Sequence, residues 1–303
     1  MARAKQKPQI RQMSVGEWEA AFPDEDACDA YLVANRWPNG VHCPRCGSAR
    51  VYELKTRKWH WECPDCRQGG AYRFSDITGT IFENTNKPLR DWFRVIHLML
   101  TSKKGISARQ LHRYMGFGSL KTAWYMAHRV RAGLVDKEFQ KLMGIVEVDE
   151  TFVGGKKHNR HDKDDGPKGG AGGKVPVAGA VSRTGKKVVA RVIERADQAT
   201  LENFIYQTVS DKVSLLATDD SKVYHWLHET FPHETVVHSA HQYVHGVIHT
   251  NTIEGFFSIL KRGIVGTFHQ VSRKYLPLYV AEFQFRYNNR ENAEIFQTAI
   301  AGC

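Results

Sequence analysis

The chain has 303 residues, which is about two domains at the usual ~150 residues per domain. Hydrophobic residues make up 42% of the sequence, enough to build a core and to exclude a wholly disordered protein. Lys and Arg outnumber Asp and Glu by 43 to 32, and the formal net charge of +11 favours a polyanionic partner such as nucleic acid. No apolar stretch reaches the roughly 18 residues of a membrane-spanning helix, and the basic N-terminus lacks the apolar segment of a secretory signal. We therefore expect a cytoplasmic protein with no membrane partner.

The first part of the chain, residues 1–37, is predicted to be a short helical segment. Two amphipathic stretches between residues 14 and 36 have helical spacing. Ser14 and Glu17 stand in the S-x-x-E relation of a capping box, which indicates where the first of these helices begins.

Four of the six cysteines form two CxxC pairs, Cys43 with Cys46 and Cys63 with Cys66, separated by 16 residues. Two such turns present four thiolates to one ion, so the spacing predicts a zinc ribbon over 38–75 with a structural Zn²⁺. Single CxxC motifs can instead be redox dithiols, but two at this spacing favour zinc. Basic and aromatic residues are interleaved in the ribbon and favour a DNA contact: Arg45, Lys55, Arg57, Lys58, Trp59 and Trp61.

The next part, residues 76–138, is predicted to be helical. Within it, residues 106–131 indicate a helix, a turn that contains glycine, and a second helix over about 119–131, which is the layout of a helix-turn-helix. Residues 101–135 carry no acidic side chain and seven basic ones, which we predict to contact DNA phosphates: Lys103, Lys104, Arg109, Arg113, Lys121, Arg129 and Arg131. A solvated basic face on a helical linker is the alternative.

After Gly144 the pattern changes to that of an α/β domain over 139–303. Strand-like runs cover residues 144–153, 175–183 and 186–194, followed by a helix over 198–210, a strand over 213–219 and helical segments to the end. Residues 155–174 are rich in Gly, Lys and Asp, which predicts a mobile loop.

Three carboxylates stand out in this domain by their context. Asp149 and Asp219 each end a strand-like run, and Glu254 lies in a segment with a helical apolar stripe. Carboxylates at the ends of two strands and on a helix are what a two-metal phosphodiester site requires, with Mg²⁺ or Mn²⁺ as the ions. The 34 residues between Asp219 and Glu254 give a D…D-x34-E pattern, and Lys261 returns to the face of Glu254 two turns later.

The spacing leaves alternatives open. Glu147 and Glu150 compete with Asp149 for the first position, and Asp220 competes with Asp219 for the second. Asn251 and Glu254 could equally form a capping box at the start of their helix.

The motifs taken together resemble those of a group of bacterial insertion-sequence transposases, the zinc-ribbon DDE enzymes related to the eukaryotic Merlin elements. The resemblance runs from about residue 20 to 295, and its most specific blocks are VDETFVGG and HTNTIEGFFSILKRG. The other matching segments are CPxC…CPxC, FSDITGTIF, SKKGISARQLHRYMG, KTAWYMAHRVR, TDDSKVY and LYVAEFQFRYNNR.

The resemblance implies an RNase H-like catalytic domain behind the ribbon and the helix-turn-helix. It puts the acidic triad on Asp149, Asp219 and Glu254, with Lys261 as the accompanying basic residue. Some members of the group use Asn as the third ligand, which keeps Asn251 as a reserve candidate. The implied function is a transposase that binds the terminal inverted repeats of its element as a homo-oligomer on nucleoid DNA and moves them by metal-dependent strand cleavage and transfer. A catalytically inactive DNA-binding regulator and a host nuclease of the same fold are the alternatives.

Overall fold

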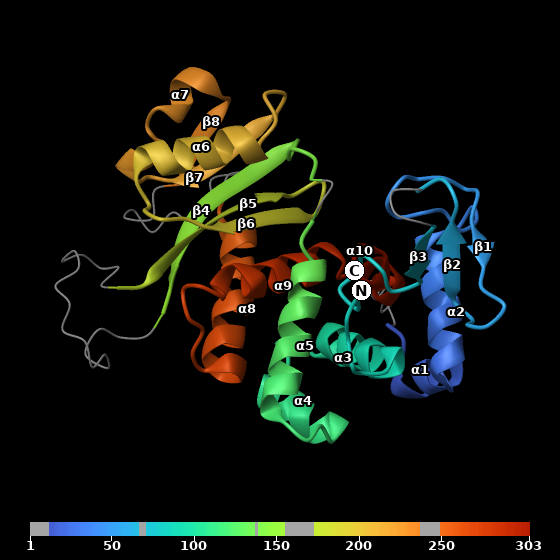
Figure 1. Cartoon of the computed structure of the whole chain (residues 1–303). Helices are drawn as coiled ribbons and strands as arrows, with labels where there is room; N and C mark the ends of the chain where they lie inside the picture. Colours follow the sequence, from blue (N-terminus) through green and yellow to red (C-terminus); the bar gives the residue numbers. More distant parts are fainter. Residues whose placement is uncertain (1–11, 67–70, 137–138, 155–172, 237–248) are drawn as a thin grey trace, which may run out of the picture. The chain divides into compact units, whose positions relative to one another are not determined.

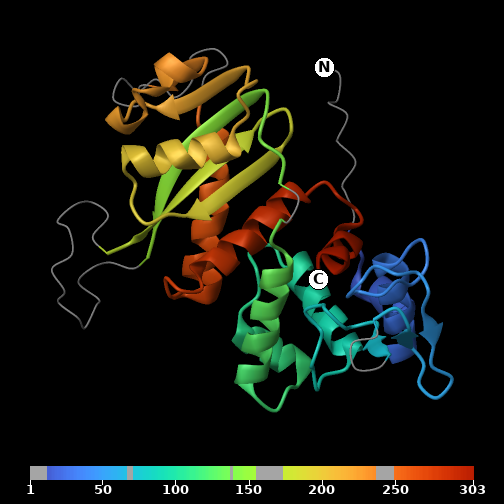
Figure 2. The same ribbon diagram turned by 45° about the horizontal axis from the view of Figure 1, so that its top comes forward.

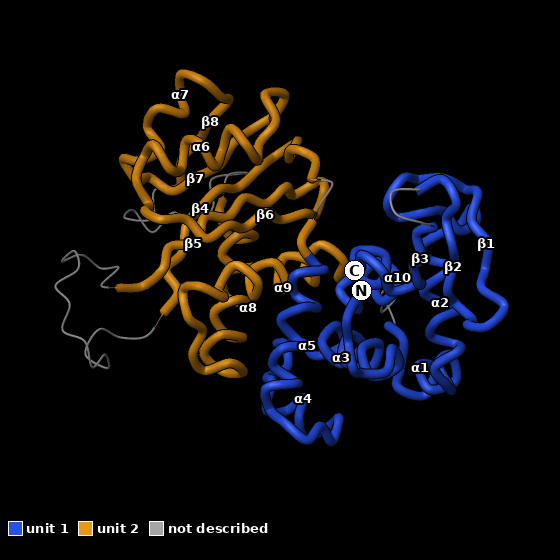
Figure 3. The backbone as a smooth tube through the Cα atoms, in the orientation of Figure 1, with its two compact units in different colours: residues 1–134, 291–303 blue, residues 135–290 orange. Residues whose placement is uncertain are grey.

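The structure of the chain is a computed structural model, which describes residues 12–66, 71–136, 139–154, 173–236 and 249–303. The chain packs into two compact units (Figure 3), unit 1 of residues 1–134 and 291–303 and unit 2 of residues 135–290. Most of the predicted loop at 155–174 lies outside the described residues. None of the helices within the described ranges is long and apolar enough to cross a membrane.

Unit 1 contains a small antiparallel sheet and six helices among its described residues. The sheet has the order β1-β2-β3 (Figure 1), formed by β1 (Tyr52–Glu53), β2 (His60–Cys63) and β3 (Tyr72–Ser75). The helices are α1 (Val15–Ala21), α2 (Glu25–Arg36), α3 (Leu89–Thr101), α4 (Ala108–Met115), α5 (Leu120–Gly133) and α10 (Ile295–Gly302).

The local signals in the N-terminal part are confirmed. The side chain of Ser14 accepts a hydrogen bond from the amide of Glu17, and Glu17 accepts one from the amide of Ser14, so the capping box is complete. Within the predicted ribbon, β1 and β2 form a hairpin, and a third strand, β3, that the sequence did not indicate pairs with β2.

An aromatic core joins the two ends of unit 1. Phe22, at the end of α1, lies with its ring centroid 5.2 Å from that of Phe93 and 5.5 Å from that of Phe296. Phe296 belongs to α10, which lies within the predicted α/β domain of residues 139–303 but packs on α2 and α3 in unit 1. Edge-to-face and tilted ring pairs of this kind bury large apolar areas and fix the angle between helices.

Unit 2 is built on a mixed five-stranded sheet with the order β6-β5-β4-β7-β8. Strands β4, β5 and β6 form an antiparallel meander. Strand β7 pairs in parallel with β4, and β8 pairs in parallel with β7. A mixed sheet with helices following its strands confirms the predicted α/β domain. The strands are β4 (Ile145–Val153), β5 (Val175–Ser182), β6 (Lys187–Val192), β7 (Leu215–Asp219) and β8 (His233–Val236).

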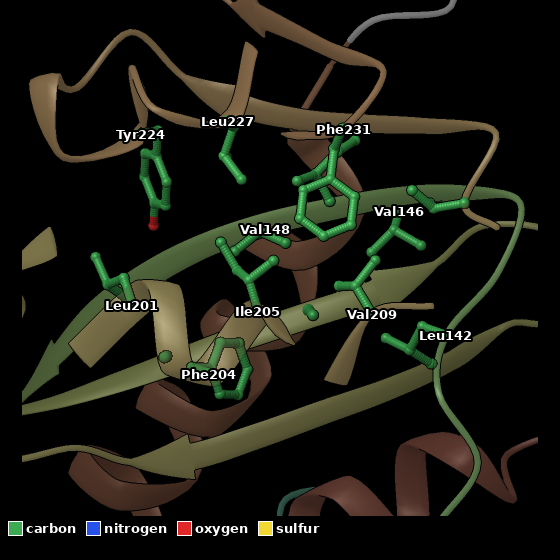
Figure 4. Packing of buried hydrophobic residues seen from close by; sticks show 14 of the residues in the cluster. Leu142, Val146, Val148, Leu201, Phe204, Ile205, Val209, Tyr224, Leu227 and Phe231 are labelled. Carbon is green, nitrogen blue, oxygen red and sulfur yellow. The ribbon is translucent and has the colours of Figure 1, made fainter. Parts of the chain in front are cut away.

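Helices cover both faces of this sheet, as both views of the ribbon show (Figures 1 and 2). Helices α6 (Gln198–Thr208) and α7 (Leu227–Thr230), with the short 3-10 helix Lys222–Tyr224, pack on the face that carries Val146 and Val148 (Figure 4). Helices α8 (Asn251–Gly263) and α9 (Leu276–Asn288), joined by the π-helical turn Ile264–Phe268, pack on the other face. Because side chains alternate along a strand, Glu147 and Asp149 face α8.

Helix α8 approaches the sheet closely at Gly179, the residue of β5 that pairs with Asp149. A Cβ at Gly179 would lie 2.8 Å from the ring of Phe257 and 2.9 Å from the side chain of Ile253. The predicted apolar stripe of Ile253, Phe257, Leu260 and Ile264 is buried, as expected. The missing side chain therefore lets α8 rest on β5, the strand paired with the one that carries Asp149.

We expect the Gly179→Ala variant to be destabilised by about 1–3 kcal/mol, the usual cost of overpacking a filled core, because α8 must move away from β5. The matched control is Gly255→Ala, in the same helix, where a Cβ meets nothing within 4 Å. Alanine there should stabilise the helix by up to about 1 kcal/mol. Urea unfolding of the two variants gives the comparison. If the two variants unfolded at the same urea concentration, α8 could move away from β5 without a loss of stability.

Candidate functional site

The four cysteines of the predicted zinc ribbon converge in unit 1. Their Sγ atoms all lie within 4.8 Å of one another, and the Sγ–Sγ distances are 3.7 Å for Cys43–Cys66 and for Cys46–Cys63. Four thiolates about 2.3 Å from a tetrahedral zinc stand roughly 3.8 Å apart, so the donor set fits this ion. Cys28 is buried in α2 and apart from the cluster.

The aromatic residues of the ribbon divide between core and surface. Trp61 is buried against Trp37 and Phe74, so its prediction as a DNA contact is wrong. The indole of Trp59 donates a hydrogen bond of 2.8 Å to Asp26. Arg45, Lys55, Arg57 and Lys58 are exposed, and the guanidinium of Arg45 stacks 3.8 Å above the ring of Tyr72.

Asp149 and Asp219 lie on neighbouring strands of unit 2, at the same end of their pairing. The parallel pairing of β4 with β7 ends with Glu147 and Ala217, and each aspartate lies two residues beyond that last pair. Neighbouring strands are about 4.8 Å apart, and the alternation of side chains turns both aspartates towards the face covered by α8. Asp149 Oδ1 accepts a hydrogen bond from the amide of Glu150, and Asp219 Oδ1 accepts one from the amide of Ser221.

Glu254 is exposed in the first turn of α8, where its Oε1 accepts a hydrogen bond of 2.9 Å from the hydroxyl of the buried Thr250. The N-cap of this helix is Thr250, which rules out the alternative in which Asn251 and Glu254 form a capping box. Asn251 and Lys261 are both exposed, and Lys261 lies in the last turn.

The surroundings distinguish the competing carboxylates. Glu147 is fully buried and bonded to Arg183 and to α8, which leaves it no exposed oxygen. Glu150 points to the opposite face of the sheet, where it accepts a hydrogen bond of 2.6 Å from the buried hydroxyl of Tyr224. Asp220 is exposed beyond the end of β7. None of these surroundings was visible in the sequence, because each partner comes from a distant element.

The carboxylates influence one another electrostatically. Burial and then the negative charge of Glu150 raise the pKa of Asp149 to about 7. Asp219 and Glu254 act in the same direction, which puts them within electrostatic reach of Asp149. Among the residues that the structure describes, the cysteines are the group of metal-binding side chains that converges within 4.8 Å, so the carboxylates interact at longer range. Crowded carboxylate oxygens are the donor set that Mg²⁺ and Mn²⁺ prefer.

Helices α4 and α5 form the predicted pair of helices with a short turn between them. Gly116 ends α4 in the left-handed conformation, with φ of 63°, and Ser119 caps the N-terminus of α5. Five of the seven predicted DNA contacts are exposed: Lys103, Lys104, Arg109, Arg113 and Lys121. Tyr114 and Tyr125 are exposed beside them, at 61% and 52%.

The other two arginines of the set are used inside unit 1. Arg131 is only 2% exposed, and this burial contradicts its prediction as a phosphate contact. Arg129 is half-buried, donates a hydrogen bond of 3.0 Å to the carbonyl of Glu83 and lies over the ring of Trp92. The charge count in the sequence could not separate these roles, because helix periodicity alone does not say which side packs.

Two family models match the chain, the ISXO2-like transposase domain over residues 141–288 and the transposase zinc-ribbon domain over residues 23–76. A relative described as an uncharacterized protein in transposable element ISH50, from Halobacterium salinarum, is 31% identical over 288 residues, which cover 88% of this chain and 91% of the relative.

Solved structures give more distant likenesses. The catalytic core domain of BIV integrase is 13% identical with a TM-score of 0.30, over 46% of this chain and 80% of that one. A chain of the simian T-cell lymphotropic virus intasome, bound to the PP2A regulatory subunit B56 gamma, is also 13% identical with a TM-score of 0.30, over 57% and 67%. Likenesses this distant leave the assignment to the sequence relationship. On that relationship, the chain belongs to the ISXO2-like family of DDE transposases with an N-terminal zinc ribbon.

Proposed function

We propose that this transposase binds the terminal inverted repeats of its element, cleaves a DNA strand at each end and joins the freed 3′-hydroxyl to target DNA. The observation that carries this proposal is the placement of Asp149 and Asp219 two residues beyond the last β4–β7 pair, on the face covered by α8, whose first turn carries Glu254. Three carboxylates so grouped fit a site that handles phosphodiesters.

In the proposed site, Asp149, Asp219 and Glu254 hold two Mg²⁺ or Mn²⁺ ions. When bound, such ions activate the attacking oxygen and stabilise the leaving one. Burial, and after it the negative charge of neighbouring carboxylates, raises the pKa of Asp149, and such grouped negative charge supports a site that favours cations. The exposed Lys261, two turns after Glu254, serves to contact the DNA backbone beside the reacting phosphate. Cleavage and joining are then two in-line displacements at phosphorus, in which no side chain forms a covalent bond to DNA.

DNA ends are held, in this proposal, by unit 1. The exposed basic residues on α4 and around the start of α5 supply phosphate contacts, and the N-terminal part of α5 enters the major groove. The ribbon adds the exposed Arg45, Lys55, Arg57 and Lys58 to the same charge. Because two ends of an element must react together, we expect at least two copies of the chain on DNA.

We expect Asp149→Asn, Asp219→Asn and Glu254→Gln each to slow cleavage by about 10³-fold or more, roughly 4 kcal/mol in the barrier. A missing carboxylate removes both a ligand and the charge that holds the second ion. The measurement is single-turnover cleavage and strand transfer with DNA that carries the inverted repeats.

The controls for this experiment are Glu150→Gln and Asp220→Asn, which change the neighbouring carboxylates and should keep most of the activity. Binding to DNA ends should survive in all five variants, because unit 1 provides it. If a control abolishes cleavage while its neighbour in the triad tolerates substitution, the assignment of that ligand is wrong.

We expect the double variant Arg109→Gln/Arg113→Gln to weaken the salt dependence of DNA binding by up to about two units of slope, roughly one for each lost phosphate contact. These arginines are four residues apart on α4 and both exposed, so they share a face. Lys187→Gln/Lys212→Gln, which removes the same charge from the surface of unit 2, is the control. If both double variants showed the same salt dependence of DNA binding, the arginines of α4 would not contact the DNA.

We expect Cys43→Ser to lose the stoichiometric zinc of the purified protein and to unfold the ribbon, because metal binding supplies folding free energy at such small sites. Cys28→Ser is the control, since Cys28 lies outside the cluster. Elemental analysis and thermal unfolding follow the two variants. Wild-type zinc content in Cys43→Ser, or no zinc in the wild type, would refute a structural zinc site at the cysteines.

A further inference from the structure

Glu147 is a fully buried carboxylate in the middle of β4, on the strand face that also carries Asp149. We propose that Glu147, held by Arg183, is a positioning residue that fixes the first turn of α8 and so sets where Glu254 stands relative to Asp149. The proposal rests on the proposed function of the acidic triad.

The carboxylate of Glu147 takes the place of a helix cap. The N-cap residue of α8, Thr250, makes no side-chain capping bond. Instead Glu147 Oε2 accepts hydrogen bonds from the backbone amides of Thr252, at 2.8 Å, and of Ile253, at 3.0 Å. Glu147 Oε1 accepts a hydrogen bond of 2.6 Å from the hydroxyl of Thr252. Free amides at a helix start need such acceptors, and a negative charge is favoured there by the helix dipole. A residue more than a hundred positions earlier therefore caps α8.

Arg183, which directly follows β5, offsets the buried charge of Glu147. Its Nε donates a hydrogen bond of 2.5 Å to Glu147 Oε1, and its Nη2 donates one of 2.6 Å to the carbonyl of His249. The backbone amide of Arg183 is bonded to the carbonyl of Ile145, at the start of β4. His249 Nδ1 also lies 3.2 Å from Glu147 Oε1. Arg183 thus holds both the carboxylate and the chain segment that leads into α8.

The clamp acts on Glu254 through the backbone. Ile253, whose amide Glu147 binds, immediately precedes Glu254. On the other side of the clamped amides, the hydroxyl of the buried Thr250 donates to Glu254 Oε1. If the first turn of α8 frays, Glu254 loses both its backbone position and this hydrogen bond. Both oxygens of Glu147 are occupied, which makes this residue a support for the ligand set and not a member of it.

The test compares Glu147→Gln with Glu282→Gln in the full-length protein. Glu282 is the matched control, because it too is fully buried in unit 2 and lies 3.6 Å from an arginine, Arg286, but it belongs to α9. A glutamine at 147 has one acceptor oxygen and must turn its NH₂ group towards donors. Two readouts are used: amide hydrogen exchange in the first turn of α8, and Mn²⁺ binding followed by the electron paramagnetic resonance of the free ion.

In Glu147→Gln we expect exchange of the Thr252 and Ile253 amides to accelerate about tenfold or more, and Mn²⁺ affinity to fall by on the order of tenfold to a hundredfold, as for other residues that orient metal ligands. The concentration of Mg²⁺ or Mn²⁺ that half-saturates cleavage should rise in parallel, while binding to DNA ends stays unchanged. Glu282→Gln should lower the melting temperature without any of these shifts.

A second pair of variants keeps the test valid if Glu147→Gln does not fold. Thr252→Val removes one hydrogen bond to Glu147 and should give a smaller shift of the same kind, and Thr252→Ser should restore the wild-type values. Wild-type Mn²⁺ affinity and exchange in folded Glu147→Gln, or in Thr252→Val, would overturn the positioning role. An active Glu254→Gln would instead overturn the proposed triad, so the two failures are distinguishable.

Discussion

The close approach of α8 to the central sheet is the constraint on which unit 2 depends. Gly179 leaves room for Ile253 and Phe257, and the buried Glu147 binds the first amides of the helix. The apolar contact sets the distance of α8 from β5, and the charged contact sets its axial position. Burial of a carboxylate is costly unless it is paired and fully hydrogen-bonded, and here Arg183 and Thr252 meet both conditions.

A second consequence of this packing is the crowding of negative charge. Asp149 and Asp219 share one face of the sheet, and burial with neighbouring charge raises the pKa of Asp149 to about 7. Such an arrangement costs folding free energy, since a buried carboxylate favours its neutral form. Apolar clusters on both faces of the sheet stabilise the domain against this cost. In our proposal the metal ions that the site binds offset the same charge.

Unit 1 solves a different problem, since its ribbon is too small for a large core. A few aromatic rings around Trp37 and Phe74, together with the four convergent thiols, hold its three short strands. In the helical part, packing divides the arginines into those that face inwards and those left for a partner. Arg131 is buried and Arg129 is bonded to the carbonyl of Glu83, whereas Arg109 and Arg113 are exposed.

The sequence by itself determined whatever depends on local spacing. The cysteine pairs, the capping box at Ser14, the apolar stripe of α8 and the strand that ends at Asp219 all follow from periods of a few residues. The prediction that Asp149 ends its strand is wrong, because β4 continues to Val153. Only the tertiary structure decided the third strand of the ribbon, the packing of α10 in unit 1 and the burial of Arg131. It also decided that Thr250 and a distant Glu147, and not Asn251, cap α8. These outcomes depend on which face of each element meets another element far away in the chain, and periodicity carries no information about that choice.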